Sequence, residues 1–175
     1  QSGRCIGLID YLNTQPFQYS LARRLNGKDV RFVRGVPTAL NRALANGDVD
    51  LAPISAIEAA RHAEEVVIIP QLGIASLGAV KTVLLFSWKP DPHELAGQPM
   101  ALTDQSATSA ALLQLLFRER YHADADWRAR PQNLAAMMSE CQGALVIGDA
   151  ALVEGSEHRM LITPNGETAR PYVFD

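Results

Sequence analysis

The sequence contains little of what marks several large classes of protein. It has only two cysteines, Cys5 and Cys141, which lie far apart and lack metal-ligand spacing, so we expect free thiols and a reducing, cytoplasmic compartment. None of its apolar runs reaches the roughly 18 residues that a membrane-spanning helix needs. The net charge of −3 arises from interspersed acids and bases, without the basic stripe typical of nucleic-acid binding. What remains is an ordinary globular composition, sufficient for one large domain or two small lobes.

Motifs of covalent, metal and nucleotide chemistry are missing as well. There is no G-x-S-x-G, Walker or H-E-x-x-H pattern, and the glycines form no dinucleotide-binding fingerprint. The four histidines, at positions 62, 93, 122 and 158, show no paired spacing, so we expect them at the surface. We therefore expect chemistry that needs no metal, no cofactor and no covalent nucleophile.

What is present is a regular alternation of strand and helix patterns. Apolar runs predict strands at residues 5–9, 30–36, 49–54, 66–69, 79–87, 100–103, 143–147, 160–162 and 172–174, with another beginning at Trp127. Helical spacing predicts helices from Asn13 or Thr14 to about 25, and over 37–44, 106–120, 133–139 and 149–153, with a short helix after Ser55. This alternation, with nearly continuous apolar strands, predicts an α/β fold with mostly parallel, doubly covered sheets.

A segment with two prolines, Ser87 to Pro92, interrupts the rhythm and predicts a linker. We therefore expect two α/β lobes, residues 1–87 and 88–175, with a cleft between them. Ligands of parallel sheets bind beyond the carboxyl ends of the strands, close to the N-termini of helices. Candidate site residues should lie at those junctions.

Four strand-to-helix junctions carry polar residues, and helix capping explains most of them. Ser55 with Glu58 has the pattern of a capping box, and Asp149 after Gly148 is also better explained as a cap. The turn 106–109 has three hydroxyl residues, more than one cap requires, which favours a cradle for a carboxylate or phosphate. Taken alone, Thr82 is explained as a strand residue.

These pieces together resemble one family, the chorismate dehydratases of the futalosine route to menaquinone. The similar segments, in order, are 7–17 (GLIDYLNTQPF), 35–37 with 40–41, 47–50 with 53–55, 73–76 with 78–80, 83–87, 106–109 and 147–152. The sister family, 1,4-dihydroxy-6-naphthoate synthase, opens with a different turn and fits less well. The resemblance covers roughly residues 4 to 152.

The resemblance implies a periplasmic-binding-protein-like fold of type II, with two α/β lobes and a cleft between them. It also implies a carbon–oxygen lyase that removes water from chorismate, a small dicarboxylate, to give 3-[(1-carboxyvinyl)oxy]benzoate. Family members carry a further C-terminal segment that returns to the first lobe, which we expect to be absent or truncated here. The alternatives are a solute-binding protein for a small carboxylate, which has the same fold, and the sister synthase.

The resemblance also suggests roles for individual residues. Asn13 is expected at the reacting face, and Thr82 is expected to hydrogen-bond the substrate or its leaving group. The expected substrate-binding residues are Ser55, Ser106, Thr108, Ser109, Gly148 and Asp149. No side chain in these segments is an evident general base, so we favour proton transfer to the substrate's own side-chain carboxylate over Asp10.

Overall fold

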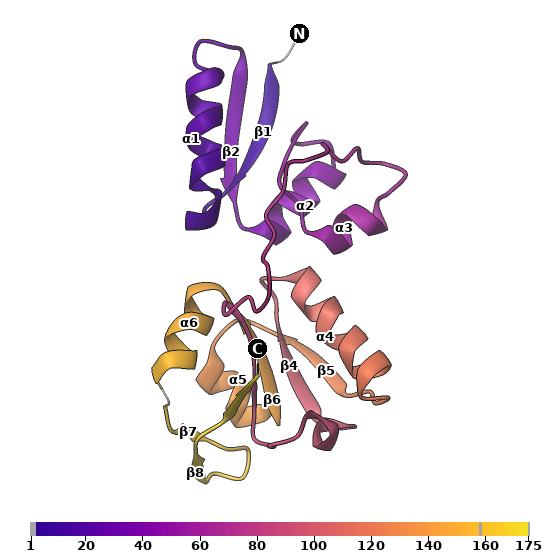
Figure 1. Ribbon diagram of the computed structural model, residues 1–175, viewed down its shortest axis with the longest axis vertical. Helices are drawn as coiled ribbons and strands as arrows, with labels where there is room; N and C mark the ends of the chain where they lie inside the picture. Colours follow the sequence, from indigo (N-terminus) through magenta and orange to yellow (C-terminus); the bar gives the residue numbers. More distant parts are fainter. Residues whose placement is uncertain (1–2, 158, 175) are drawn as a thin grey trace. The chain divides into compact units, whose positions relative to one another are not determined.

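The computed structural model describes residues 3–157 and 159–174. The chain folds into two compact units, unit 1 (Gln1–Ala75) and unit 2 (Ser76–Asp175), each built around its own β-sheet (Figure 1). Within the described residues, no helix combines the length and the hydropathy that crossing a membrane requires.

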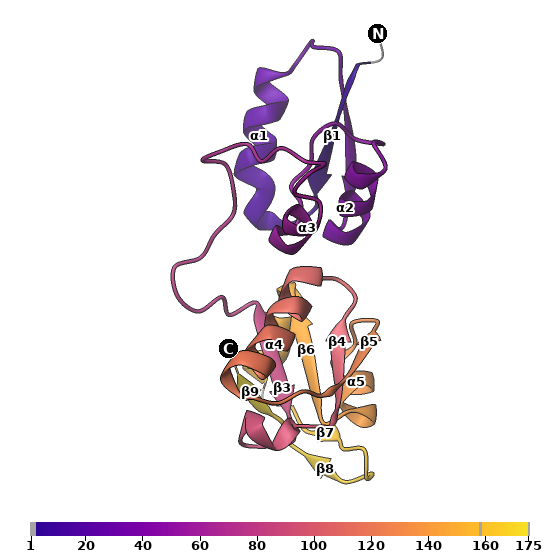
Figure 2. The same ribbon diagram turned by 90° about the vertical axis from the view of Figure 1, so that its right-hand side faces the viewer.

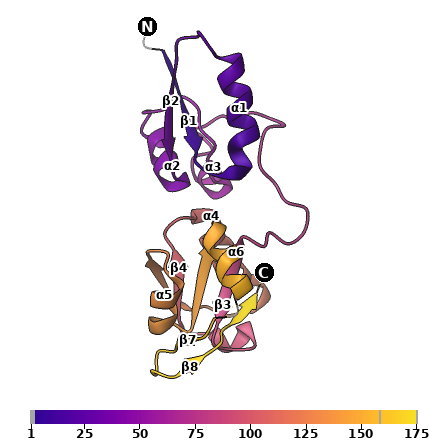
Figure 3. The same ribbon diagram turned by 90° about the vertical axis from the view of Figure 1, so that its left-hand side faces the viewer.

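Unit 1 is built on two parallel strands. The strands β1 (Arg4–Ile9) and β2 (Val30–Gly35) pair in register from Arg4 opposite Val30 to Ile9 opposite Gly35. A 3-10 turn, η1 (Leu12–Thr14), leads into α1 (Gln15–Arg24), and α2 (Pro37–Ala45) and α3 (Ala56–Arg61) complete the unit. The helices α1 and α2 flank the strands from opposite sides (Figures 2 and 3).

The core of unit 1 forms where β1 meets α2. Leu40 of α2 is 1% exposed, and β1 is buried from Cys5 onward. Gly7 allows this close approach, because a Cβ on Gly7 would lie 2.9 Å from both the Leu40 Cδ2 and the Ala52 Cβ atoms. The continuous apolar run of β1 therefore predicts its burial correctly.

Two predicted strands of unit 1 are wrong. Residues 49–54 contribute one isolated parallel bridge, between Ile6 and Leu51, instead of a strand. The Asp50 carboxylate accepts a hydrogen bond from the Cys5 N–H at 2.7 Å, and so takes the place of the backbone carbonyl of a neighbouring strand. Pro53 has no N–H to donate to such a strand pair. Residues 66–69 are irregular and largely exposed, with Val67 94% exposed, because no neighbouring strand pairs with them.

Unit 2 contains a five-stranded mixed sheet in the order β5-β4-β6-β3-β9. Its strands are β3 (Val83–Ser87), β4 (Pro99–Thr103), β5 (Asp126–Arg130), β6 (Gly143–Ile147) and β9 (Tyr172–Phe174). The strand β4 is parallel to β5 and β6, whereas β3 is antiparallel to β6 and β9. The expectation of mostly parallel sheets therefore holds for β5, β4 and β6 and is wrong for β3 and β9.

The helices of unit 2 cover both faces of this sheet. They are η2 (Pro92–Leu95), α4 (Ala107–Arg120), α5 (Leu134–Glu140) and α6 (Gly148–Glu157). A separate two-stranded ribbon is formed by β7 (Leu161–Ile162) and β8 (Thr168–Ala169). The helix α6 begins at Gly148 and extends beyond the predicted Val153.

Unit 2 has one hydrophobic cluster on each face of the sheet. On one face, α5 and α6 pack against β3, β4 and β6, and this cluster includes the buried Cys141. On the other face, the Phe117 ring of α4 makes edge-on contacts with Tyr121 and Trp127. Cys5 and Cys141 are both free, as predicted, and both are buried; burial raises the pKa of the Cys141 thiol.

The boundary between the units lies earlier than the sequence suggested. The strand β3 hydrogen-bonds β6 and β9 inside the sheet of unit 2, so the boundary falls after Ala75 and not after Ser87. The predicted strand 79–87 begins only at Val83, because Lys81 has a positive φ of 47° that extended backbone does not adopt. The proline-bearing segment 88–92 is a connection within unit 2.

Candidate active site at the carboxyl ends of the strands

The strand directions of unit 2 bring several candidate residues to one edge of its sheet. The parallel strands β4, β5 and β6 all end at this edge, and the antiparallel β3 begins there, because Val83 pairs with Ile147. Thr82, the turn before α4 and the start of α6 therefore lie along the same border, which we call the unit 2 edge. Three of the predicted site segments, including 106–109 and 148–149, are thus collected by the topology.

The turn before α4 forms a helix cap through the Ser106 and Ser109 side chains. The Ser106 Oγ atom accepts the Ser109 N–H at 3.1 Å and lies 2.8 Å from the Ser109 Oγ atom. Capping is thus confirmed for Ser106. Thr108 lies in the first turn and is partly exposed. Binding of an anion at this turn remains a prediction.

Thr82 and Gly148 are joined through the backbone. The Gly148 N–H donates to the Thr82 carbonyl oxygen at 2.7 Å, and the Thr82 hydroxyl donates to the Val80 carbonyl oxygen at 3.1 Å. Gly148 has a φ of 69°, which favours glycine, and this turn directs the chain from β6 into α6. Asp149 is exposed and lies inside the helix, so the prediction that it precedes the helix as a cap is wrong.

Gln132, which the sequence did not single out, lies at the unit 2 edge and reaches the end of β6. It follows β5, and its side-chain amide bonds both backbone groups of Ile147, the last residue of β6. The Nε2 atom donates to the Ile147 carbonyl oxygen at 3.0 Å, and the Oε1 atom accepts the Ile147 N–H at 2.9 Å. The Nε2 atom also lies 3.5 Å from the Gln105 Oε1 atom, in the turn that leads to Ser106.

The corresponding border of unit 1, which we call the unit 1 edge, presents Asn13. This residue is exposed in η1, four positions after the end of β1, and its side chain makes no hydrogen bond to another described residue. Thr14 beside it is 2% exposed, and its hydroxyl lies 2.7 Å from both the Ile9 and Tyr11 carbonyl oxygens. Thr14 occupies the N-cap position of α1, but its hydroxyl bonds within the turn and makes no cap bond to the helix.

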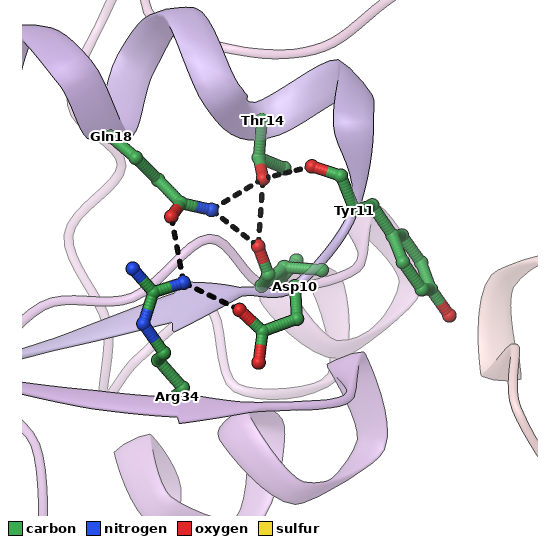
Figure 4. A network of polar contacts seen from close by, with 6 residues as sticks. Asp10, Tyr11, Thr14, Gln18 and Arg34 are labelled. Atoms are coloured by element: carbon green, nitrogen blue, oxygen red, sulfur yellow. Dashed lines mark hydrogen bonds and ion pairs between the residues drawn. The ribbon is translucent and has the colours of Figure 1, made fainter.

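A buried glutamine extends this network from α1 (Figure 4). Gln18 is 6% exposed, and its Nε2 atom donates to the Ile9 carbonyl oxygen at 2.6 Å and to the Thr14 Oγ1 atom at 2.8 Å. Its Oε1 atom accepts from the Arg34 guanidinium at 3.0 Å, and Arg34 also pairs with Asp10 at 2.5 Å. Both partners of that ion pair are more than half exposed, so the pair itself adds little stability.

Ser55 occupies the N-cap position of α3, as predicted, but the predicted capping box is wrong. The side chain makes no cap bond to α3; instead Asn41 of α2 bonds both the Ser55 hydroxyl, at 3.2 Å, and the Ser55 N–H, at 3.3 Å. Glu58 pairs with Arg61 at 2.6 Å and so does not complete a capping box. Ser55 ends the segment that runs parallel to β1 through the Ile6–Leu51 bridge, so it lies toward the unit 1 edge.

The described residues contain no group of three or more histidine, cysteine, aspartate or glutamate side chains that could hold a metal ion. His93 and His122 are exposed and His62 is partly buried beside Glu65, at 3.1 Å, while His158 lies outside the described residues. The polar groups collected at the two edges are therefore mainly amides, hydroxyls and backbone N–H groups. Such groups can bind and polarise a carboxylate or a hydroxyl, but they are weak bases.

The family of the chain follows from its sequence. Residues 5–163 match the family described as menaquinone biosynthesis. The chain belongs to this family. A curated relative, the chorismate dehydratase of Thermus thermophilus, is 38% identical to this chain over 147 residues. These residues cover 84% of this chain and 51% of the relative. The chain thus spans about half the length of the curated relative it matches.

Solved structures identify the fold of this menaquinone biosynthesis family member. A structural-genomics protein from Archaeoglobus fulgidus superposes with a TM-score of 0.58 at 13% identity, covering 98% of this chain and 61% of that protein. The periplasmic aliphatic sulphonate binding protein of Escherichia coli superposes with a TM-score of 0.55 at 15% identity, covering 98% and 57%. The predicted α/β fold of the type II periplasmic binding proteins is thereby confirmed.

Proposed function

We propose that the protein is a chorismate dehydratase, a hydro-lyase that acts in menaquinone biosynthesis. The observation that carries the proposal is the 38% identity to the Thermus thermophilus enzyme over 84% of this chain, within a shared family. The polar strand ends support it, because both edges present neutral hydrogen-bonding groups suited to a small dicarboxylate. The likeness to sulphonate-binding proteins supports the fold alone.

The proposed reaction removes the C3 proton and the C4 hydroxyl of chorismate as one molecule of water. The electron pair of the C3–H bond enters the ring, the C4–O bond breaks, and the ring becomes the benzoate of 3-[(1-carboxyvinyl)oxy]benzoate. Aromatisation provides the driving force. Because the C3–H bond is conjugated through the ring to the C1 carboxylate, negative charge develops on that carboxylate during proton loss. Donors directed at its oxygens would stabilise the transition state, as an oxyanion hole does.

The hydroxyl and N–H groups of the 106–109 turn are the proposed donors to a substrate carboxylate. Thr108 lies in the first turn of α4, where the helix dipole favours a negative charge. Gly148 and Asp149 at the start of α6, and Ser55 in unit 1, complete the proposed binding set. The proposal requires the groups of both edges to reach one substrate molecule.

Asn13 and Thr82 are the proposed catalytic residues. The Asn13 amide can donate to one substrate group and accept from another, which suits it to orient the C4 hydroxyl. The Thr82 hydroxyl, partly exposed at the unit 2 edge, can hydrogen-bond the departing oxygen. For the proton at C3 we propose the substrate's own enolpyruvyl carboxylate as the acceptor, since Asp10 is paired with Arg34.

The direct test incubates the purified protein with chorismate and follows the absorbance of the cyclohexadiene and of the benzoate product, with the product identified by mass. We expect loss of one water and appearance of 3-[(1-carboxyvinyl)oxy]benzoate. Binding of chorismate without any turnover would contradict the proposal and favour a solute-binding protein of the same fold.

A further inference from the structure

Each unit contains one glutamine whose side-chain amide bonds the last residue of a parallel strand. In unit 1, Gln18 bonds the carbonyl of Ile9, where β1 ends. In unit 2, Gln132 bonds both the carbonyl and the N–H of Ile147, where β6 ends. The two glutamines come from different kinds of element, a helix and a loop, yet they act on the same feature of the fold.

The chemistry of the partners defines the orientation of each amide. A carbonyl oxygen can only accept and a guanidinium can only donate, so the Gln18 Nε2 atom must face Ile9 and its Oε1 atom must face Arg34. Likewise, Ile147 offers one N–H and one carbonyl, which only the opposite ends of the Gln132 amide can satisfy. A glutamate could not donate to the carbonyl oxygens, and an apolar residue of the same length could make none of these bonds.

The bonds of Gln18 bear on the turn that carries Asn13. The Ile9 carbonyl and the Thr14 hydroxyl, both bonded by Gln18, stand at the two ends of the segment 10–13. The segment is exposed between these ends, with Leu12 83% exposed, so packing contributes little to its conformation. The path of the backbone at Asn13 therefore depends on the buried network beneath it.

The bonds of Gln132 bear on Thr82 and on the turn before α4. Ile147 precedes Gly148, whose N–H donates to the Thr82 carbonyl oxygen at 2.7 Å. The contact of Gln132 with Gln105 connects the same amide to the segment before Ser106, and the Gln105 N–H donates to the buried Thr103 hydroxyl at 3.2 Å. One side chain thus links the ends of β4 and β6.

We propose that Gln18 and Gln132 are positioning residues of the proposed dehydration: Gln18 sets the position of Asn13, and Gln132 sets that of Thr82 and the 106–109 turn. The inference rests on the proposed function. Neither glutamine touches the substrate; each acts through the strand end that it bonds. Loss of either amide displaces a reacting group while the hydrophobic cores of both units remain intact.

The kinetic test compares Gln18→Met and Gln132→Met with a matched control, Gln114→Met, on the exposed side of α4. We expect kcat for chorismate to fall about 10- to 100-fold in each test variant, with KM changed by less than about threefold, because misplacement of a reacting group chiefly affects the chemical step. The control should retain the kcat of the unmodified protein. A test variant that also retained this kcat would overturn the proposal for its glutamine.

A glutamate variant distinguishes the bond of Gln18 to the strand end from a simpler role of Gln18 in holding Arg34. Gln18→Glu keeps an acceptor for the guanidinium but places a carboxylate oxygen against the Ile9 carbonyl. We expect it to be at least as impaired in kcat as Gln18→Met. Restoration of kcat by glutamate would show that Gln18 serves Arg34 and not the strand end.

Amide hydrogen exchange tests whether the two glutamines hold the strand ends, and it requires no turnover. In Gln18→Met the Thr14 N–H, bonded to the Tyr11 carbonyl, should exchange at least about tenfold faster, while the Gly148 N–H is unchanged. Gln132→Met should give the reverse pattern. Unaltered exchange at both sites would overturn the proposal. Absence of chorismate turnover by the unmodified protein would instead refute the proposed function, and the exchange rates would still show whether the glutamines hold the edges.

Discussion

The two units fix their strand ends by different means. In unit 2 a five-stranded sheet is covered by hydrophobic clusters on both faces, and backbone bonds such as that between Gly148 and Thr82 join its edge. Unit 1 has two paired strands, and the turn that presents Asn13 is held from below by the Thr14 and Gln18 side chains. Site geometry in unit 2 therefore depends on main-chain bonds together with the Gln132 side chain, whereas in unit 1 it depends on buried side chains.

This difference predicts where each unit is vulnerable. Substitutions in the core of unit 2 should lower the free energy of unfolding of this unit, because the sheet that carries the unit 2 edge is closely packed on both faces. Substitutions in the polar network of unit 1 should impair activity first, because the network determines a single exposed turn. The following changes test the comparison, in order of decreasing expected effect.

Phe117→Ala should be the most destabilising of these changes. The Phe117 ring is fully buried and contacts the Tyr121 and Trp127 rings, so its removal should lower the free energy of unfolding by about 3–5 kcal/mol. Chemical denaturation provides the measurement. The control Leu112→Ala removes an exposed side chain from the same helix and should change this free energy by less than about 0.5 kcal/mol. Equal effects of the two variants would contradict the assignment of this core.

Asn13→Ala should abolish measurable turnover and leave the fold intact. Asn13 is proposed to orient the C4 hydroxyl, which gains negative charge as it leaves, and loss of such a group costs about 100-fold or more in kcat. The exposed Asn13 side chain makes no bond to another described residue that its removal would break. The assay is chorismate turnover, with circular dichroism as the check on folding. Asn46→Ala, at an exposed asparagine after α2, should turn over chorismate normally. Unchanged turnover in Asn13→Ala would remove Asn13 from the site.

Gly148→Ala should impair both stability and activity. An alanine with a φ of 69° costs about 1–2 kcal/mol, and relief of that strain would displace the bond to Thr82. Gly97→Ala is the matched control, since Gly97 has the same φ and donates its N–H to the Asp124 carbonyl at the same 2.7 Å distance. Both variants should lose similar stability, measured by denaturation, but only Gly148→Ala should lose kcat. Equal kcat in the two variants would refute a role for the β6–α6 junction.

Thr108→Ala should weaken binding without unfolding the protein. Loss of one hydrogen bond to a carboxylate lowers affinity about three- to tenfold, and isothermal titration with a benzoate-type dicarboxylate measures it. An unchanged dissociation constant would leave the 106–109 turn with its observed capping role alone.

Asp50→Asn should have the smallest effect, a weaker dependence of the unfolding temperature on pH in the acid range. The Cys5 N–H, and secondarily Arg4, lower the pKa of the Asp50 carboxyl in the folded protein. The carboxylate therefore stabilises the fold above the ordinary pKa of about 3.9, and this stabilisation is lost as pH falls through the lowered value. Thermal unfolding between pH 2 and 6, on the order of the range over which carboxyl groups titrate, should show a shallower dependence on pH in Asp50→Asn. An identical pH dependence in both proteins would contradict this account.

The elements that the sequence predicts well are those with a continuous apolar pattern. Residues 5–9 and 143–147 are buried on both sides, and their composition alone indicates a strand. The apolar residues 66–69 have the same composition, but no strand is available to pair with them. Pairing depends on segments far away in the sequence, so local propensity could not distinguish these cases.

The candidate site shows a similar division. Residues at strand-to-helix junctions, such as Ser106 and Gly148, are recognisable from the pattern because topology determines where such junctions lie. Gln18 and Gln132 carry no motif, and their partners are 9 and 15 positions away. One signal existed for Gln18, which shares a helical face with the apolar Leu21 and Leu25. A polar residue on such a face needs buried partners, and these were found only in the folded chain.

Nuclear magnetic resonance titration of the isotope-labelled protein with 3-[(1-carboxyvinyl)oxy]benzoate tests the central claim most directly. We expect saturable shifts of the Asn13 side-chain amide in unit 1 and of the backbone amides of Thr82, Thr108 and Gly148 in unit 2, all with one dissociation constant. Shifts confined to one unit, or to residues away from the carboxyl ends of the strands, would contradict it.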